Sequence, residues 1–431
     1  MLGISWWLLG HAIVRALLFL ISNPLLYVGW ILYALVLAKE AKQQRRSFGV
    51  RLTRVGPALW GQIWRSLVAG AALSVAMVAL GVVIRPWDVW FLLGITVVLA
   101  AIRLRFSAAA TTIGVMVILA NIAKLWQPKG LPSSLSSFWN HVANIPVYSW
   151  LCLAALVCFA EFWLLFSAPK GTRPVLVQSK RGRTIGAMSV QLIFVVPLLA
   201  LVPGTVARPE VAASWPWLGA WAGPLSLVGI PLVLGMGGMF TTVKTKRAIR
   251  FTAWSSLLSA VVIGLSATLA LWHPSFAFVG GIVAFVSREL AVMFHRRWEA
   301  RQEPIYVPSE QGVRLLAVVE GSLAQTIGLQ AGEVITHVNQ IPVHSEYDLH
   351  FAYSQNPAYA KLQVVDEQGE PRILGKAVYD GERAKLGVVS SPDGLEDECY
   401  VRTYFGLLHG LYARQENAVP DDASASESMN V

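Results

Sequence analysis

Long apolar segments separated by short polar connections fill the first 300 residues of the chain. A helix needs about 20 apolar residues to cross a bilayer. Eight segments come near this length, although the second and third are short, and they run over residues 62–84, 87–102, 106–123, 148–167, 186–203, 217–240, 253–272 and 275–292. Together with the apolar N-terminus, the pattern predicts an α-helical polytopic membrane domain over residues 1–298, with about nine or ten helices.

The N-terminal stretch allows two interpretations. Met1–Ile21 is apolar and rich in tryptophan, but His11 and Arg15 interrupt it. Asn23-Pro24 then breaks the pattern before a second apolar run, Leu25–Ala38. An interfacial helix followed by one short span fits this stretch, and so do two spans, so the sequence leaves open whether residues 4–21 cross the membrane.

Basic residues fall in every second connection between the apolar segments. They cluster at 39–54, 103–105, 170–183, 244–250 and 288–301, whereas the other connections carry proline and tryptophan. Because basic loops stay on the cytoplasmic side, the alternation supports the spans and predicts a cytoplasmic C-terminal domain. Charge also divides the chain, since residues 1–300 carry a net +20 and residues 301–431 a net −10. The overall charge of +10 therefore gives no indication of nucleic-acid binding.

Few charged or helix-breaking residues interrupt the spans. Glu161 is either a transport or proton site or a hydrated or paired carboxylate, and Asp88 lies beside Trp87 at a segment boundary. Helix breakers concentrate in the segments 186–203 and 217–240. They are Pro197, Pro203, Pro224, Pro231 and the run Gly235–Gly238. Since no inverted repeat is visible, they favour close packing of helices over the broken helices of a transporter.

Residues 310–395 show a different pattern, with short apolar strands, glycine corners and short helices. Val318–Ser322 predicts a strand that runs into a tight turn, and Ser322 can cap the short helix that follows. Gly328 and Gly332 lie where the backbone needs a positive φ. Glu333–Asn339 predicts the next strand. A linker over 299–309, with two prolines, separates this domain from the spans.

Further elements follow in order. Ile341–Val343 predicts a short strand, and Ser345 caps a helix that Asn356-Pro357 ends. The segments 361–366 and 372–378 predict a hairpin, and a last strand follows around Leu386–Val388.

This frame resembles the core of a PDZ domain, whose usual form is V-x-x-G-S-x-A, then A-G-L-x-x-G-D-x-I, then V-N-G. Here Ile327 stands for the first alanine, Glu333 for the aspartate and Gln340 for the last glycine. The fold class implied is an α-helical polytopic membrane domain followed by a small α+β PDZ domain. Because the Leu386-Gly387-Val388 strand follows the hairpin, the arrangement resembles the circularly permuted PDZ domains of bacterial site-2 proteases.

The resemblance implies a peptide-binding groove between this last strand and the 345–355 helix. A ligand strand would add to the sheet edge, and the loop at Leu386-Gly387 would offer N–H groups to a carboxylate. Leu349 would face the core, and His350 is either a ligand contact or a solvated helix histidine. The expected groove residues are Leu386, Gly387, Val388, Glu346, His350 and Tyr353.

The C-terminal end carries two further segments. Residues 398–414 have apolar positions at helical spacing and predict an amphipathic helix, which could pack on the PDZ domain, lie on the membrane or pair with a partner helix. Residues 415–431 are polar and acidic, and their composition predicts a disordered tail. The three cysteines form no disulfide framework.

Catalytic motifs are missing. No histidine is followed by glutamate, which excludes the H-E-x-x-H zinc motif of site-2 proteases. There is no G-N-S-G-G nucleophile loop, Walker A motif or dinucleotide fingerprint, and the eight histidines form no metal-ligand pattern. We therefore expect no enzymatic activity, no metal and no cofactor.

The combination of many spans, a cytoplasmic permuted PDZ domain and an early Asn23–Tyr27 run before the basic 39–54 segment resembles the MinJ-like cell-division topology proteins of Gram-positive bacteria. The resemblance implies a scaffold at septa and poles that links a DivIVA-like scaffold to a MinD-like ATPase and other division proteins. It implies contact with the lipid bilayer, no nucleic acid and possible homo-oligomers. A PDZ adaptor for membrane proteolysis and a transporter with a regulatory PDZ domain remain alternatives.

Overall fold

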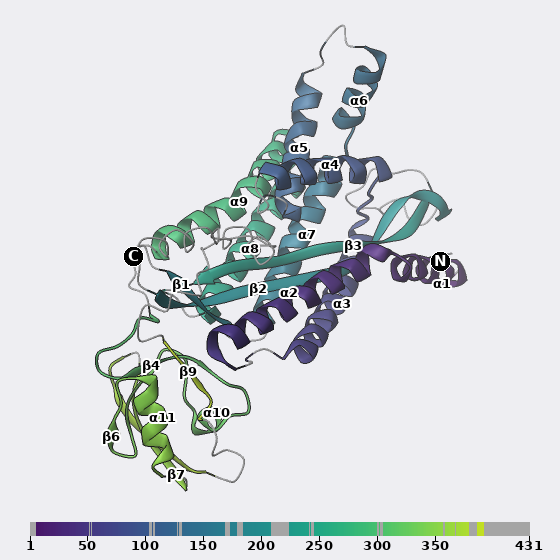
Figure 1. Cartoon of the computed structure of the whole chain (residues 1–431). Coiled ribbons are helices and arrows are strands. Elements are labelled where there is room, and N and C mark those ends of the chain that lie inside the picture. Colours follow the sequence, from purple (N-terminus) through teal and green to yellow (C-terminus); the bar gives the residue numbers. More distant parts are fainter. Residues whose placement is uncertain are drawn as a thin grey trace, which may run out of the picture.

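The computed structural model describes residues 6–391, apart from residues 51, 53, 103–105, 107, 127, 129–131, 169–172, 179–183, 208–223, 241, 243–244, 300, 302–304, 357, 367 and 379–385. Apolar helices make up most of residues 6–299, and a smaller region of short strands follows (Figure 1). The helices of the first part are α1 (Trp6–Ile21), α2 (Pro24–Phe48), α3 (Val55–Leu80), α4 (Pro86–Ile102), α5 (Ala109–Leu125), α6 (Ser133–Ala143), α7 (Val147–Phe166), α8 (Thr245–Leu269) and α9 (Ser275–Glu299).

Five of these helices, α2, α3, α7, α8 and α9, are long and apolar enough to cross a membrane. α4 and α5 are apolar but have only 17 residues each, and α1 has 16. α1 and α2 are separate helices because Asn23 caps the second one, accepting a hydrogen bond from the Leu25 N–H at 3.0 Å, and Pro24 takes its first position. The helical region fits a multi-pass membrane protein.

Residues 186–203 and 225–240 form strands and not the expected helices, so this part of the sequence prediction was wrong. β2 (Thr184–Ala207) and β3 (Leu225–Phe240) pair as a long antiparallel hairpin, which β1 (Arg173–Gln178) extends to three strands in the order β1-β2-β3. Apolar length alone does not distinguish a buried strand from a membrane helix. Proline breaks the hydrogen-bond ladder of a helix, and here Pro197 and Pro231 lie directly opposite each other in the hairpin.

A strand edge inside an apolar layer needs partners for its backbone groups. α3 supplies them to β2 along a buried stripe of small and polar residues spaced four apart: Gln62, Ser66, Gly70 and Ser74. The Gln62 amide donates to the Ile193 carbonyl at 3.2 Å, and the Leu199 N–H donates to the Ser74 hydroxyl at 2.8 Å. Helix α3 therefore covers the outer edge of β2.

Proline and glycine complete this contact. The Leu199 N–H points toward α3, and backbone groups two residues apart in a strand point to the same edge. The nitrogen of Pro197 therefore also faces α3, so its missing N–H removes no hydrogen bond to β3. A Cβ atom at Gly70 would overlap the Pro197 carbonyl oxygen, so glycine permits the close approach of helix and strand. On the β3 side, Gly229 admits the backbone of α1 near Ala16 in the same way.

The C-terminal region forms one antiparallel sheet with two short helices. Its elements are β4 (Val313–Val318), α10 (Leu323–Ile327), β5 (Val334–Val338), β6 (Ile341–Pro342), α11 (Glu346–Ser354), β7 (Tyr359–Val365), β8 (Pro371–Ala377) and β9 (Val388–Ser390). The strand order is β8-β7-β5-β4-β9, with β6 paired to β5. Leu315, Ile335, Val338 and Leu362 lie in its core, and Leu349 joins them from α11 as expected.

The expected strand Val318–Ser322 lies earlier, since β4 ends at Val318, but the caps and glycine turns of this region follow the sequence expectations. Ser322 caps α10 by accepting a hydrogen bond from the Gln325 N–H at 3.3 Å, and Gly328 and Gly332 have φ of 92° and 99°. At the β5–β6 turn, Asn339 and Gln340 also have positive φ, 51° and 71°. Gln340 occupies the position of the last glycine in the PDZ pattern. The positive φ explains why glycine is usual there.

The base of the hairpin contacts the C-terminal sheet (Figure 1). Leu176 of β1 and Met188 of β2 pack with Leu316 of β4 and Val389 of β9 in one buried cluster. The Gly186 N–H donates to the Tyr306 carbonyl at 3.0 Å. The two regions thus share a small hydrophobic core. The expected helix 398–414 and tail 415–431 lie outside the described residues.

Candidate binding site

Helix α11 is held in place by a capping box. The Ser345 hydroxyl accepts a hydrogen bond from the Asp348 N–H at 3.1 Å, and the Asp348 carboxylate accepts from the Ser345 N–H at 3.0 Å. The hydrogen bond from the Ser345 side chain, followed by those from backbone N–H groups, lowers the pKa of Asp348 below its usual value. The cap fixes the start of the helix, which is the part closest to β9.

Strand β9 is an edge strand of the sheet. Its described partner is β4, with Val388 opposite Val318 and Ser390 opposite Leu315. The Ser390 hydroxyl donates to the Glu346 carboxylate at 2.6 Å and thereby links the end of β9 to the first turn of α11. The structure therefore brings the two expected walls of the groove together.

The loop before β9 presents N–H groups. The Leu386 carbonyl accepts from the Ala324 N–H at 3.0 Å, and the Gly387 carbonyl accepts from the Val319 N–H at 2.9 Å. Among the described residues, the backbone N–H groups of Leu386 and Gly387 take part in no hydrogen bond. The expected carboxylate-binding loop thus keeps two backbone donors that no described residue uses.

Gly387 has a structural role as well. Its φ is 82°, and a Cβ atom there would overlap the side chain of Ser322. A larger residue at this position would disturb the loop itself, so glycine is needed for folding and not only for access by a ligand.

The side chains expected in the groove separate into two groups. Tyr353 and Leu386 are 6% and 2% exposed and pack in the core of the sheet. Glu346 and His350 are exposed, and the His350 Nε2 lies 3.8 Å from a Glu346 carboxylate oxygen. Val388 is partly buried at the edge. The accessible candidates are therefore Val388, Glu346 and His350, with Leu386 and Gly387 contributing backbone groups.

The charged residue noted in a span is paired. A carboxylate oxygen of Glu161 lies 2.9 Å from the Arg288 Nη1, and the Ser256 hydroxyl lies 3.4 Å from the other oxygen. Arg288 also donates to the Gly235 carbonyl of β3 at 2.8 Å. This arrangement supports the paired interpretation of Glu161 over a transport site.

The sequence-based predictions did not include the buried stripe on α3. Its signal was present, because Gln62, Ser66, Gly70 and Ser74 recur every four residues inside an apolar helix. Within the described residues, no group of three or more His, Cys, Asp or Glu side chains could hold a metal ion.

Together these features define the class of the protein: a helical membrane protein that encloses a β-hairpin and carries a C-terminal sheet region with an open edge. Two kinds of relative share most of the chain. One is the "Cell division topological determinant MinJ" of Bacillus subtilis (strain 168), 28% identical over 365 residues, which are 83% of this chain and 89% of the relative.

The other is the "Probable cell division topological determinant MinJ" of Lacticaseibacillus paracasei, 28% identical over 407 residues, which are 89% of this chain and 99% of the relative. The protein of that name from Lacticaseibacillus casei (strain BD-II) matches equally. The resemblance to MinJ-like proteins is therefore confirmed. No family model matches the chain, and no solved structure matches it.

Proposed function

We propose that the protein is a non-enzymatic membrane scaffold that helps to determine where the cell divides. The observation that carries the proposal is the similarity to MinJ proteins over more than four fifths of the chain, which spans the helices, the hairpin and the C-terminal sheet. A shared role would then use both halves of the molecule. The sequence carries no catalytic motif that would suggest a reaction instead.

In this proposal the C-terminal region, residues 310–395, is a circularly permuted PDZ domain that binds a segment of a partner protein. The free edge of β9 beside α11 supports it, as do the two N–H groups of the Leu386-Gly387 loop. A partner segment would add to β9 as a further strand. Main-chain hydrogen bonds contribute only about 0.5–1.5 kcal/mol each, so side-chain contacts with Val388 and His350 supply the specificity.

The proposed orientation places the C-terminal region in the cytoplasm. An antiparallel hairpin, like a pair of spanning helices, enters the membrane and returns to the same side. The basic clusters that flank β2 and β3, at 170–183 and 244–250, therefore stay on one side of the membrane although two expected helices are strands. The positive-inside rule then assigns that side to the cytoplasm. A reporter that is active only outside the cytoplasm, fused after Val431, should stay silent, and activity would contradict this orientation.

The proposed partners are a DivIVA-like polar scaffold and a MinD-like ATPase. Localisation tests this role: a fluorescent fusion of the full chain should concentrate at septa and poles in a rod-shaped host. Uniform membrane fluorescence would contradict it. If the fusion instead co-localises with a membrane protease and its substrates, the alternative role as an adaptor for membrane proteolysis is the better model. The paired Glu161 offers no support for transport.

A pair of variants tests the binding edge. Val388→Pro removes an N–H on the free edge of β9, and partner capture by the full chain should fall at least tenfold. Phe351→Ala changes an exposed residue on another face of α11 and serves as the matched control, with no expected loss. Unchanged capture by a folded Val388→Pro variant would place the contact elsewhere.

A further inference from the structure

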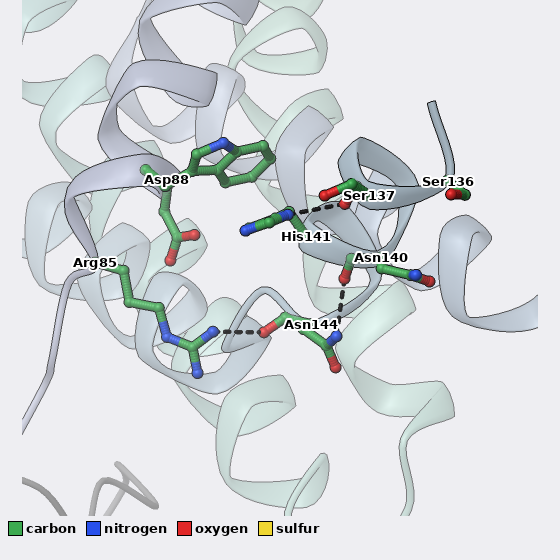
Figure 2. A pocket seen from close by; sticks show the side chains of 8 residues that line it. Arg85, Asp88, Ser136, Ser137, Asn140, His141 and Asn144 are labelled. Carbon is green, nitrogen blue, oxygen red and sulfur yellow. Dashed lines mark hydrogen bonds between the residues drawn. The ribbon is translucent and has the colours of Figure 1, made fainter. Parts of the chain in front are cut away.

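A cavity of about 650 Å³ lies between the start of α4 and the short helix α6 (Figure 2). Helix α6 lies at the end of the molecule remote from the C-terminal sheet (Figure 1). All its lining residues except Trp87 carry polar or charged side chains, among them Arg85, Asp88, Ser137, Asn140, His141 and Asn144. The volume falls in the range of about 300–1,000 Å³ that is usual for small-molecule sites.

Aromatic contacts hold the two walls of the cavity together. The Trp87 ring of α4 stacks on Phe91 at 5.4 Å and lies 5.1 Å from the His141 ring of α6. Phe138 of α6 meets the edge of the same tryptophan at 5.9 Å. The contacts with Phe138 and His141 thus pack α4 against α6 in the structure without a ligand, and such preorganisation lowers the entropic cost of binding.

The two full charges in the lining already have partners within the protein. The Arg85 Nη1 donates to the Asn144 carbonyl at 3.1 Å. Asp88 is 2% exposed and accepts a hydrogen bond from the Trp150 indole at 3.2 Å. The lining therefore carries one cation and one anion, whose formal charges sum to zero.

The remaining polar groups both donate and accept. The His141 Nδ1 lies 2.8 Å from the Ser137 carbonyl and must donate to it, so Nε2 is left for the cavity (Figure 2). Among the described residues, no hydrogen bond uses the Asn140 side-chain amide or the Ser137 hydroxyl. The Asn144 amide nitrogen donates to the Asn140 carbonyl, which leaves its own side-chain oxygen as an acceptor.

We propose that this cavity binds a neutral polyhydroxylated ligand, namely one or two rings of a saccharide. A hydroxyl group donates and accepts at the same time, so several hydroxyls on one ring match clustered amide, hydroxyl and imidazole groups. A lining with one charge of each sign favours neither a cation nor an anion. In the orientation proposed above, the site opens on the outer side of the membrane.

The test uses the full chain in lipid nanodiscs and saturation-transfer NMR titrations. The probes are N,N′-diacetylchitobiose and maltose as neutral saccharides, alanyl-alanine as a zwitterion and glucuronate as an anion. At least one neutral saccharide should bind with a dissociation constant of about 1 mM, and the two charged probes at least tenfold more weakly. Stronger binding of a charged probe, or no saccharide binding up to about 20 mM, would overturn the proposal.

Two variants locate the binding. Asn140→Leu should weaken saccharide binding at least tenfold, whereas Ser133→Ala, on the same helix but outside the cavity lining, should leave it unchanged. Circular dichroism confirms folding of both. A folded Asn140→Leu that binds normally, or a folded Ser133→Ala that loses binding, would refute the assignment.

Discussion

The two sheets of this molecule differ in whether other parts of the chain cover their strand edges. In the membrane region, α3 covers the edge of β2 with Gln62 and Ser74, and Arg288 bonds to the β3 carbonyl at Gly235. In the C-terminal region, β4 is the only strand partner of β9 among the described residues, and the other edge of β9 lies open beside α11. An unpaired backbone group is costly in an apolar layer but is readily solvated by water, so only the second edge can remain available for a partner.

The largest expected effect comes from removing the contact on the β3 edge. Arg288→Ala leaves the Gly235 carbonyl without its donor and leaves Glu161 buried without its cation. Breaking one half of such a pair costs about 3–5 kcal/mol. The thermal midpoint of the purified protein should fall steeply, whereas Arg297→Ala, an exposed arginine on the same helix, should change little. Equal midpoints would show that the β3 edge needs no partner.

Closing the gap between α3 and β2 should have the next largest effect. Gly70→Ala forces a methyl group onto the Pro197 carbonyl and should destabilise the protein by about 1–3 kcal/mol. A Cβ atom added at Gly94 of α4 would meet no other atom within 4 Å, so Gly94→Ala is the matched control. Equal stability of both variants in a thermal unfolding assay would contradict the close helix–strand contact.

A smaller loss is expected at Ser74. Ser74→Ala removes the acceptor for the Leu199 N–H and should cost about 1–3 kcal/mol, with the lower end expected if another group can accept. Hydrogen exchange followed by mass spectrometry should show faster exchange around Leu199. An unchanged exchange rate would mean that the β2 edge is satisfied in another way.

Gln340→Gly should give the smallest change, and in the opposite direction. A non-glycine residue with φ of 71° is strained, and glycine relieves the strain by about 1 kcal/mol. Protease resistance of the C-terminal region should rise slightly. Because β4 separates β5 from β9 in the sheet, partner binding at β9 should stay the same, and a change in binding would contradict an edge-only contact.

The sequence predicted the C-terminal elements well because their signals are local. Ser322 and Ser345 cap their helices, and Gly328 and Gly332 take left-handed positions, because these preferences depend on the residue itself and its near neighbours. The hairpin in the membrane region was missed because its cause is not local. Residues 186–203 are apolar enough for a helix, and only the stripe on α3, more than 100 residues earlier, satisfies the edge of the strand.

In the candidate binding site, too, some features could be predicted from the sequence and others depended on tertiary packing. The resemblance to PDZ domains implied that the last strand lies beside the 345–355 helix and that Glu346 and His350 line the groove, and in the structure both residues are exposed. The burial of Tyr353 in the core did not follow, since it depends on how α11 rotates against β5. The cavity at Asp88 was invisible for a similar reason, because α6 forms one wall and approaches α4 only in the folded chain.

The hydrophobic cluster at the base of the hairpin limits how the protein can be cut into soluble fragments. Leu316 and Val389 are buried against Leu176 and Met188 from the other half of the chain. A fragment that begins after α9 would expose these side chains to water and should self-associate at high concentration. Replacing Leu316 and Val389 with threonine in such a fragment should restore a monomer, which light scattering can measure. The two halves therefore depend on each other for solubility as well as for position.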